Sequence, residues 1–189
     1  MIMVVAAVAA LQGLAIALYL RVERGKRVPA ATFAIEIMDA APTADLELAR
    51  ADGSTIRLTA LKGRPVLVHF WATWCPPCRQ EMPAILRVSR SLKNELGLEL
   101  VAASLDERWD AIGLFFDGRP PDEVVKLAGQ GHRAWGIGQL PDSYLIGRDG
   151  AVCARISGAR DWSSPAAHDA LRRALARPKG RTSAQAESR

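Results

Sequence analysis

The first apolar segment of the chain differs from all the others because it contains no charged residue. Residues 1–20 form this segment, and a helix of that length can cross a lipid bilayer. No helical period within it leaves a polar face, so a buried helix of a soluble domain is the poorer interpretation. No basic stretch precedes it and no small-residue cleavage site directly follows it. We therefore expect an uncleaved transmembrane anchor.

Two nearly continuous apolar runs further along predict strands that are covered on both faces. They occupy residues 64–71 and 98–105. Between them, the pattern predicts a helix from about Pro76 to Asn94, which Gly97 would end. A strand, a helix and a second strand in this order predict a βαβ unit with two parallel strands.

The rest of the pattern supplies shorter elements around this unit. Asp52-Gly53 lies between two alternating runs and is a typical hairpin turn. Ser163 or Ser164 is expected to cap the last helix. The predicted elements are a hairpin over 45–58, a helical turn over 58–63, a helix over 108–117, a strand over 123–127, a hairpin of strands 140–146 and 151–157, and an amphipathic helix over 164–177.

These elements divide the chain into four parts. After the anchor over residues 1–20, we expect a basic juxtamembrane segment and linker over 21–44. A single domain should occupy 45–177, and the polar end, 178–189, is expected to be disordered.

The net charge of +5 is located at the two ends of the chain rather than in the predicted domain. Residues 21–27 and 177–189 each sum to +3, which leaves −1 for residues 28–176. A nearly neutral domain has no electrostatic footprint for nucleic acid, so we expect no nucleic-acid partner.

The candidate chemistry is a pair of cysteines in the stretch FWATWCPPCRQEMP, residues 70–83. A structural zinc site normally needs a second ligand pair at similar spacing, and the chain has none. A purely structural disulfide would close too small a loop to stabilise the fold much. A redox pair explains more, because the N-terminus of a helix favours the Cys75 thiolate while Cys78 lies one turn further in. Pro76 and Pro77 suit the first helical turn.

The stretch GRPVLVHFWATWCPPCRQEMPAIL, together with LPDSYLIGRDG, resembles a known family. It is similar to the membrane-anchored thiol-disulfide oxidoreductases of the TlpA/ResA type, which belong to the thioredoxin superfamily and include cytochrome c maturation reductases. The likeness extends over roughly residues 40–176. It implies an α/β thioredoxin fold, a central mixed β-sheet flanked by helices, preceded by a β-hairpin and the transmembrane helix.

The resemblance also assigns catalytic roles to four positions. It implies that Cys75 is the nucleophile and Cys78 the resolving thiol. Pro141 matches the family's cis-proline beside the disulfide, and the backbone of Leu140 before it would pair with an extended substrate. Glu81 matches an acidic residue that tunes thiol ionisation; the alternative is a solvated helix residue.

Four residues around the thiols are expected to contribute to the substrate-binding surface. Trp74 should be half-exposed directly before Cys75. Pro76 and Pro77, between the two cysteines, complete this surface with Leu140. We expect no bound cofactor and no metal.

The resemblance implies a single-pass protein of the inner (cytoplasmic) membrane whose domain faces the periplasm or extracytoplasmic space. A membrane electron donor would keep it reduced, and disulfide-containing clients such as apocytochrome c would be its substrates. The basic residues after the anchor favour the opposite orientation under the positive-inside rule. A thiol oxidant or isomerase on the same fold, and a copper-binding module using His132 and His168, are the alternatives.

Two further residues need an explanation. His69 lies six residues before Cys75 on a predicted apolar strand, where many anchored relatives carry asparagine. It is either a relay for the Cys78 proton or a core histidine satisfied by a backbone carbonyl, and we prefer the second. Cys153 is expected to be buried and inert.

Overall fold

The computed structural model describes residue 12 and residues 33–129 and 131–177, and the described residues from Phe33 onward belong to one compact unit. The predicted anchor and the predicted disordered tail lie outside the described residues, apart from residue 12. Within the described ranges, no helix has both the length and the apolar character needed to span a membrane.

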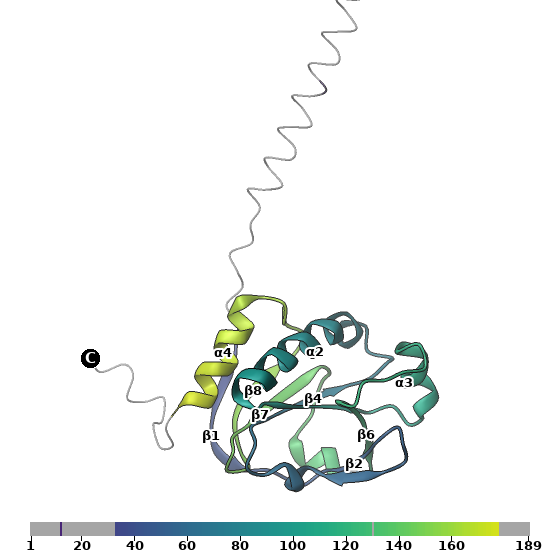
Figure 1. The fold of residues 1–189 in the computed structure, drawn as a ribbon, viewed down its shortest axis with the longest axis horizontal. Coiled ribbons are helices and arrows are strands. Elements are labelled where there is room, and N and C mark those ends of the chain that lie inside the picture. The colour runs from purple at the N-terminus through teal and green to yellow at the C-terminus, as the bar shows by residue number, and fades with distance from the viewer. Residues whose placement is uncertain (1–11, 13–32, 130, 178–189) are drawn as a thin grey trace, which may run out of the picture. The chain divides into compact units, whose positions relative to one another are not determined.

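A mixed sheet of eight strands forms the centre of this unit (Figure 1). Its central strands β4 and β5 run parallel, as the βαβ pattern predicts, while β7 pairs with β4 in the antiparallel direction. Across the sheet the order is β1 (Glu36–Pro42), β8 (Ala151–Ser157), β7 (Asp142–Ile146), β4 (Val66–Trp71), β5 (Glu99–Ser104), β6 (Val124–Ala128), β2 (Glu47–Ala49) and β3 (Thr55–Arg57). The predicted N-terminal hairpin is β2–β3, which joins the edge of the sheet through β6.

Helices cover both faces of the sheet. The helical elements are η1 (Leu58–Leu61), α2 (Pro76–Leu96), α3 (Trp109–Phe115), η2 (Gly131–Trp135) and α4 (Pro165–Ala176). Figure 1 shows α2 and α4 on the same side of the sheet. One apolar cluster lies between α2, α3, α4 and the sheet, and a second cluster with η1 and η2 lies on the other face. The fold is therefore the α/β thioredoxin-like arrangement that the resemblance implies.

Alternation along β4 distributes its side chains between the two clusters. Leu67 and Trp71 pack toward α2, whereas Val68 and Phe70 pack on the opposite face. Because successive strand residues point to opposite faces, His69 points to the same side as Leu67 and Trp71. The alternation of side chains along β4 therefore places His69 on the face of the sheet that α2 covers.

Two helix ends follow directly from local chemistry. Gly97 ends α2 in the left-handed conformation, with φ of 73°, and its N–H reaches the carbonyls of Leu92 and Lys93. The hydroxyl of Ser164, rather than that of Ser163, accepts a hydrogen bond from the N–H of Ala167 and caps α4.

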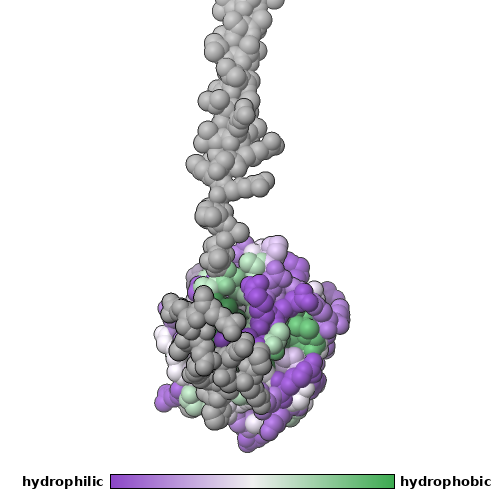
Figure 2. Space-filling view, turned by 90° about the vertical axis from the view of Figure 1, so that its left-hand side faces the viewer, coloured by the Kyte–Doolittle hydropathy of each residue, from purple (hydrophilic) through white to green (hydrophobic). Residues whose placement is uncertain are grey.

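The expected linker over residues 21–44 is wrong for its second half. Residues 36–42 form β1, which pairs antiparallel with β8, and Phe33 is buried against Trp162 with ring centroids 4.9 Å apart. The sequence of β1, EIMDAAP, does not alternate apolar and polar residues cleanly, and its pairing with β8 has a register irregularity between Ile37 and Ala41. Where grey atoms do not cover this side of the molecule, Figure 2 shows hydrophilic residues with hydrophobic patches between them.

Candidate active site

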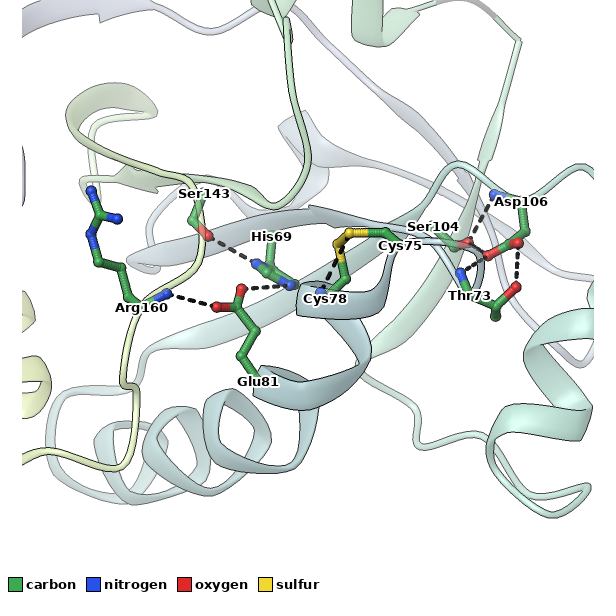
Figure 3. The surroundings of a disulfide bond; sticks show 9 residues. All are labelled: His69, Thr73, Cys75, Cys78, Glu81, Ser104, Asp106, Ser143 and Arg160. Atoms are coloured by element: carbon green, nitrogen blue, oxygen red, sulfur yellow. Dashed lines mark hydrogen bonds and ion pairs between the residues drawn. A yellow bond between two sulfur atoms is a disulfide. The ribbon is translucent and has the colours of Figure 1, made fainter.

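The two cysteines of the motif form a disulfide at the start of α2 (Figure 3). Cys75 is the N-cap residue, and its sulfur accepts a hydrogen bond from the N–H of Cys78 at 3.4 Å. Cys75 retains 5% exposure, whereas Cys78 is completely buried. Of the two sulfurs, Cys75 is therefore the one that a large partner reaches first.

The N-terminus of α2 is chemically suited to a thiolate. Pro76 and Pro77 occupy the first helical turn, where the lost N–H groups have no intrahelical acceptor anyway. The remaining unpaired N–H groups and the positive end of the helix dipole favour a negative sulfur at the N-cap. Once the disulfide is reduced, this environment favours the nucleophilic form of Cys75.

The loop between β4 and α2 is fixed by a carboxylate that the sequence analysis missed. Asp106 accepts hydrogen bonds from the backbone N–H of Thr73 at 2.9 Å, from the Thr73 hydroxyl at 2.7 Å and from the Ser104 hydroxyl at 2.6 Å. Asp106 is buried and follows the parallel neighbour strand β5. The signal in the sequence that could have predicted this role is an acidic residue two positions after a serine at the end of a predicted buried strand.

The peptide bond between Leu140 and Pro141 is cis, as the resemblance implies. Pro141 directly precedes Asp142, which pairs with Phe70 near the end of β4. The cis bond is thus placed at the same end of the sheet as the loop that leads to Cys75. Leu140 is half-buried.

The predicted substrate-binding side chains differ in their exposure. Trp74 is 65% exposed, more than the half-exposure expected, although it directly precedes a nearly buried cysteine. Pro76 is exposed and Pro77 is half-buried. A large aromatic side chain in water beside a disulfide provides an apolar surface for a partner.

Glu81 is buried, so its interpretation as a solvated helix residue is wrong. Burial raises the pKa of its carboxyl from the usual 4.5 to about 7. Contacts with the Arg160 backbone N–H, which donates to Oε2 at 2.9 Å, with Trp162 and with the Arg160 charge oppose this rise. The result is a carboxyl that can bind or release a proton near neutral pH.

His69 is completely buried, but it does not use the backbone carbonyl that we expected. Its Nδ1 lies 2.9 Å from the hydroxyl oxygen of Ser143, and its Nε2 lies 3.7 Å from Oε1 of Glu81. Register explains the first contact, because His69 and Ser143 are directly paired between β4 and β7. Burial lowers the pKa of the imidazole to about 3, which keeps the ring neutral.

The third cysteine takes no part in this cluster. Cys153 is half-buried on β8, and its thiol donates to the carbonyl of Leu145 at 3.3 Å. Burial raises the pKa of this thiol to about 11, so it carries little thiolate. The raised pKa is what an unreactive thiol would have, although the burial of Cys153 is less complete than predicted.

No group of three or more His, Cys, Asp or Glu in the part of the chain that the structure describes is arranged to hold a metal ion. Of the two histidines considered for copper, His168 faces Glu95 at 3.3 Å on the surface. His132 belongs to η2, on the opposite side of the sheet from His168.

Proteins of similar sequence carry the name thiol-disulfide oxidoreductase ResA. One from Bacillus cereus is 37% identical over 113 residues, which cover 57% of this chain and 62% of the relative. The one from Geobacillus thermodenitrificans is 32% identical over 127 residues, covering 66% and 71%. The chain thus spans less than two thirds of the length of the first relative.

Solved structures give the same fold. A putative thiol:disulfide interchange protein DsbE from Chlorobium tepidum is 31% identical with a TM-score of 0.59, covering 75% of this chain and 96% of that one. A thioredoxin family protein from Chlorobium tepidum TLS is 26% identical with a TM-score of 0.61, covering 73% and 98%. The family model described as Redoxin matches residues 24–171. This chain therefore belongs to the Redoxin family.

Proposed function

We propose that this protein is a membrane-anchored thiol-disulfide oxidoreductase that reduces disulfides of extracytoplasmic proteins such as apocytochrome c. The observation that carries the exchange chemistry is the Cys75–Cys78 disulfide at the N-terminus of α2. The names of the ResA relatives support the same reaction class. The anchor, the inner-membrane location and the extracytoplasmic orientation rest on residues 1–20 and on the family resemblance.

The reaction begins with both cysteines reduced. The Cys75 thiolate attacks one sulfur of a client disulfide, forms a mixed disulfide, and releases the other client sulfur as a thiolate. The Cys78 thiolate then attacks the Cys75 sulfur, and the client leaves as a dithiol. Two electrons pass to the client, the Cys75–Cys78 disulfide forms, and a membrane electron donor reduces it again.

The surroundings of the two sulfurs support this order of events. Complete burial keeps Cys78 from attacking clients directly but leaves it one helical turn from Cys75. Trp74 and the backbone of Leu140 provide the surface on which an extended client would lie. Glu81 is the carboxyl that would accept the Cys78 proton before resolution, because its pKa lies near neutrality.

Trapping of the mixed disulfide tests the exchange chemistry. The Cys78→Ser variant should accumulate a covalent complex with a disulfide-containing client, which dithiothreitol releases. The Cys75→Ser variant should accumulate none, and Cys153→Ser should behave like the unmodified protein. Equal trapping through Cys153 would contradict the proposed roles.

The reduction potential tests the direction of electron flow. A potential of about −250 mV or lower, near that of thioredoxin, supports the reductant. A potential of about −120 to −180 mV would instead favour an oxidant or isomerase on the same fold. The measurement is a dithiothreitol or glutathione titration followed by tryptophan fluorescence.

A further inference from the structure

We infer that His69 is a positioning residue for Glu81: a neutral imidazole, anchored by Ser143, that reverses the direction of its hydrogen bonds when Glu81 gains or loses its proton. The use of this reversal in disulfide exchange rests on the proposed function. The reversal itself is a property of the buried cluster and can be tested without any client.

Three different elements bring the cluster together (Figure 3). His69 comes from β4, Ser143 from β7 and Glu81 from the second turn of α2. The distances are 2.9 Å from His69 Nδ1 to Ser143 Oγ and 3.7 Å from His69 Nε2 to Glu81 Oε1. The imidazole thus lies between a hydroxyl and a carboxyl, one at each ring nitrogen.

Two buried polar atoms of the cluster face each other, and the indole N–H of Trp162, which also acts on the Glu81 carboxyl, is a third buried group without a hydrogen bond among the described residues. In the described part of the molecule, His69 Nε2 and Glu81 Oε1 are both buried and neither makes a hydrogen bond. The other carboxyl oxygen, Oε2, is already bound by the Arg160 N–H. A buried polar atom without a hydrogen bond destabilises the fold, so the two atoms gain by pairing with each other. Their separation exceeds a hydrogen bond by roughly 0.5 Å, which a small rotation of the carboxyl closes.

The charges around the cluster determine which group binds the proton. Arg160 is the cation on the segment before α4, Glu81 is the acid on α2, and the Cys75–Cys78 sulfurs lie at the start of the same helix. Ser143 on β7 and Trp162 before α4 carry no charge. With its pKa lowered to about 3, His69 stays neutral near pH 7, so Glu81 is the group that titrates.

A neutral imidazole and a hydroxyl can each serve either form of the carboxyl. With Glu81 protonated, its O–H donates to Nε2, and Nδ1–H donates to the Ser143 oxygen. With Glu81 ionised, Nε2–H donates to Oε1, and the Ser143 hydroxyl donates to Nδ1. Between these states one proton leaves the cluster, the imidazole changes tautomer, and no charge appears on it.

This reversal of the hydrogen bonds allows Glu81 to take up the proton of the buried Cys78 thiol without losing a hydrogen-bond partner. When Glu81 accepts the Cys78 proton, the new carboxylic acid finds an acceptor at Nε2 instead of an unpaired buried position. An asparagine at this position has a fixed donor and a fixed acceptor, so it satisfies both forms only by turning its amide.

The test is a pH titration of the full-length oxidised chain labelled with ¹⁵N-histidine. The His69 nitrogens, assigned by their loss in His69→Asn, should report the Nδ1–H tautomer at about pH 5 and the Nε2–H tautomer at about pH 9. Neither nitrogen should reach the shift of an imidazolium across this range. Glu81→Gln should hold a single tautomer at every pH, and Ser143→Ala should move the midpoint while Ser143→Thr restores it.

A single tautomer throughout the titration of the unmodified protein would overturn the inference. An imidazolium signal in the neutral range would overturn it as well, because the ring itself would then carry the proton. Neither outcome touches the trapping of clients by Cys78→Ser, so failure of this inference and failure of the proposed function are distinguishable.

Discussion

At the residue scale, the site depends on a few polar atoms that are buried next to a disulfide. Asp106 accepts three hydrogen bonds, and two of them come from Thr73, one residue before the exposed Trp74. A buried acceptor of this kind fixes the loop more firmly than a surface contact does, because water cannot replace it. The geometry of Cys75 is therefore set partly by a residue 31 positions away, on the loop that follows β5.

Replacement of Asp106 by asparagine should destabilise the protein. The amide offers one acceptor oxygen in place of two and adds two donors, so at least one buried donor loses its partner. We expect the free energy of unfolding to fall by about 1–3 kcal/mol in chemical denaturation. Asp110→Asn is the matched control: among the described residues its exposed carboxylate pairs with the exposed Arg108, so the free energy of unfolding should change by no more than about 0.5 kcal/mol. Equal effects would argue against an anchoring role for Asp106.

Replacement of Trp74 by alanine should separate client recognition from chemistry. Because the side chain is 65% exposed, the free energy of unfolding should change by less than about 0.5 kcal/mol. Loss of its apolar surface should lower kcat/KM for a protein client by about tenfold, which corresponds to about 1.4 kcal/mol. The rate with dithiothreitol, which is too small to use this surface, is the control and should not change. A parallel loss with dithiothreitol would assign Trp74 to the chemistry instead.

At the element scale, the sheet is wider than the sequence pattern predicts. β1 adds an eighth strand beside β8 and brings Phe33 onto Trp162 at the beginning of the α4 region. Trp162 is also a neighbour of His69, with ring centroids 6.3 Å apart. Phe33, just before β1, therefore packs against a tryptophan that contacts the cluster of His69 and Glu81, so this segment is part of the folded domain rather than a spacer.

The contribution of this segment is measurable with Phe33→Ala. Phe33 is 8% exposed, and removal of its ring leaves a cavity against Trp162, so the free energy of unfolding should fall by about 3 kcal/mol. Ile37→Ala on the same segment is the control, because that side chain is 38% exposed and should cost less than about 1 kcal/mol. If both variants were neutral, residues 33–42 would be a linker after all.

At the scale of the whole molecule, two buried groups give stability opposite dependences on pH. The folded-state pKa of Glu81 is raised to about 7, so its contribution is present below its ordinary value of 4.5 and is lost as pH rises through 7. The folded-state pKa of His69 is lowered to about 3, so its contribution is present above 6.5 and is lost as pH falls toward 3. The two dependences oppose each other where their ranges overlap. Stability of the oxidised protein should therefore be greatest between about pH 4.5 and 6.5.

Denaturation across pH tests both contributions. Glu81→Gln removes the contribution that is lost as pH rises. The free energy of unfolding of this variant should therefore rise from about pH 4.5 to 6.5 and should not decline toward pH 7. His69→Asn removes the contribution that is lost as pH falls. The free energy of unfolding of this variant should therefore decline between about pH 4.5 and 7, by up to roughly 3 kcal/mol. Parallel curves for the unmodified protein and both variants would mean that the pH dependence originates elsewhere in the molecule.

The sequence by itself determined the elements whose signals are local. The apolar runs at 64–71 and 98–105, the helix after Cys75 and the glycine at its end are present in the structure within a few residues, because alternation, helix capping and the conformational freedom of Gly97 act over short distances. The redox character of the Cys-X-X-Cys pair followed from the position of Cys75 at a helix start.

The tertiary structure decided every relation between groups far apart in the chain. Burial of Glu81, the contact of His69 with Ser143, the anchoring of Thr73 by Asp106 and the pairing of β1 with β8 all join residues from different elements. Strand register and helix packing set these contacts. In a sequence, a glutamate at a buried helix position looks the same as one at a solvent-exposed position. The pKa of a carboxyl depends on which of these environments surrounds it, and only the folded chain creates that environment.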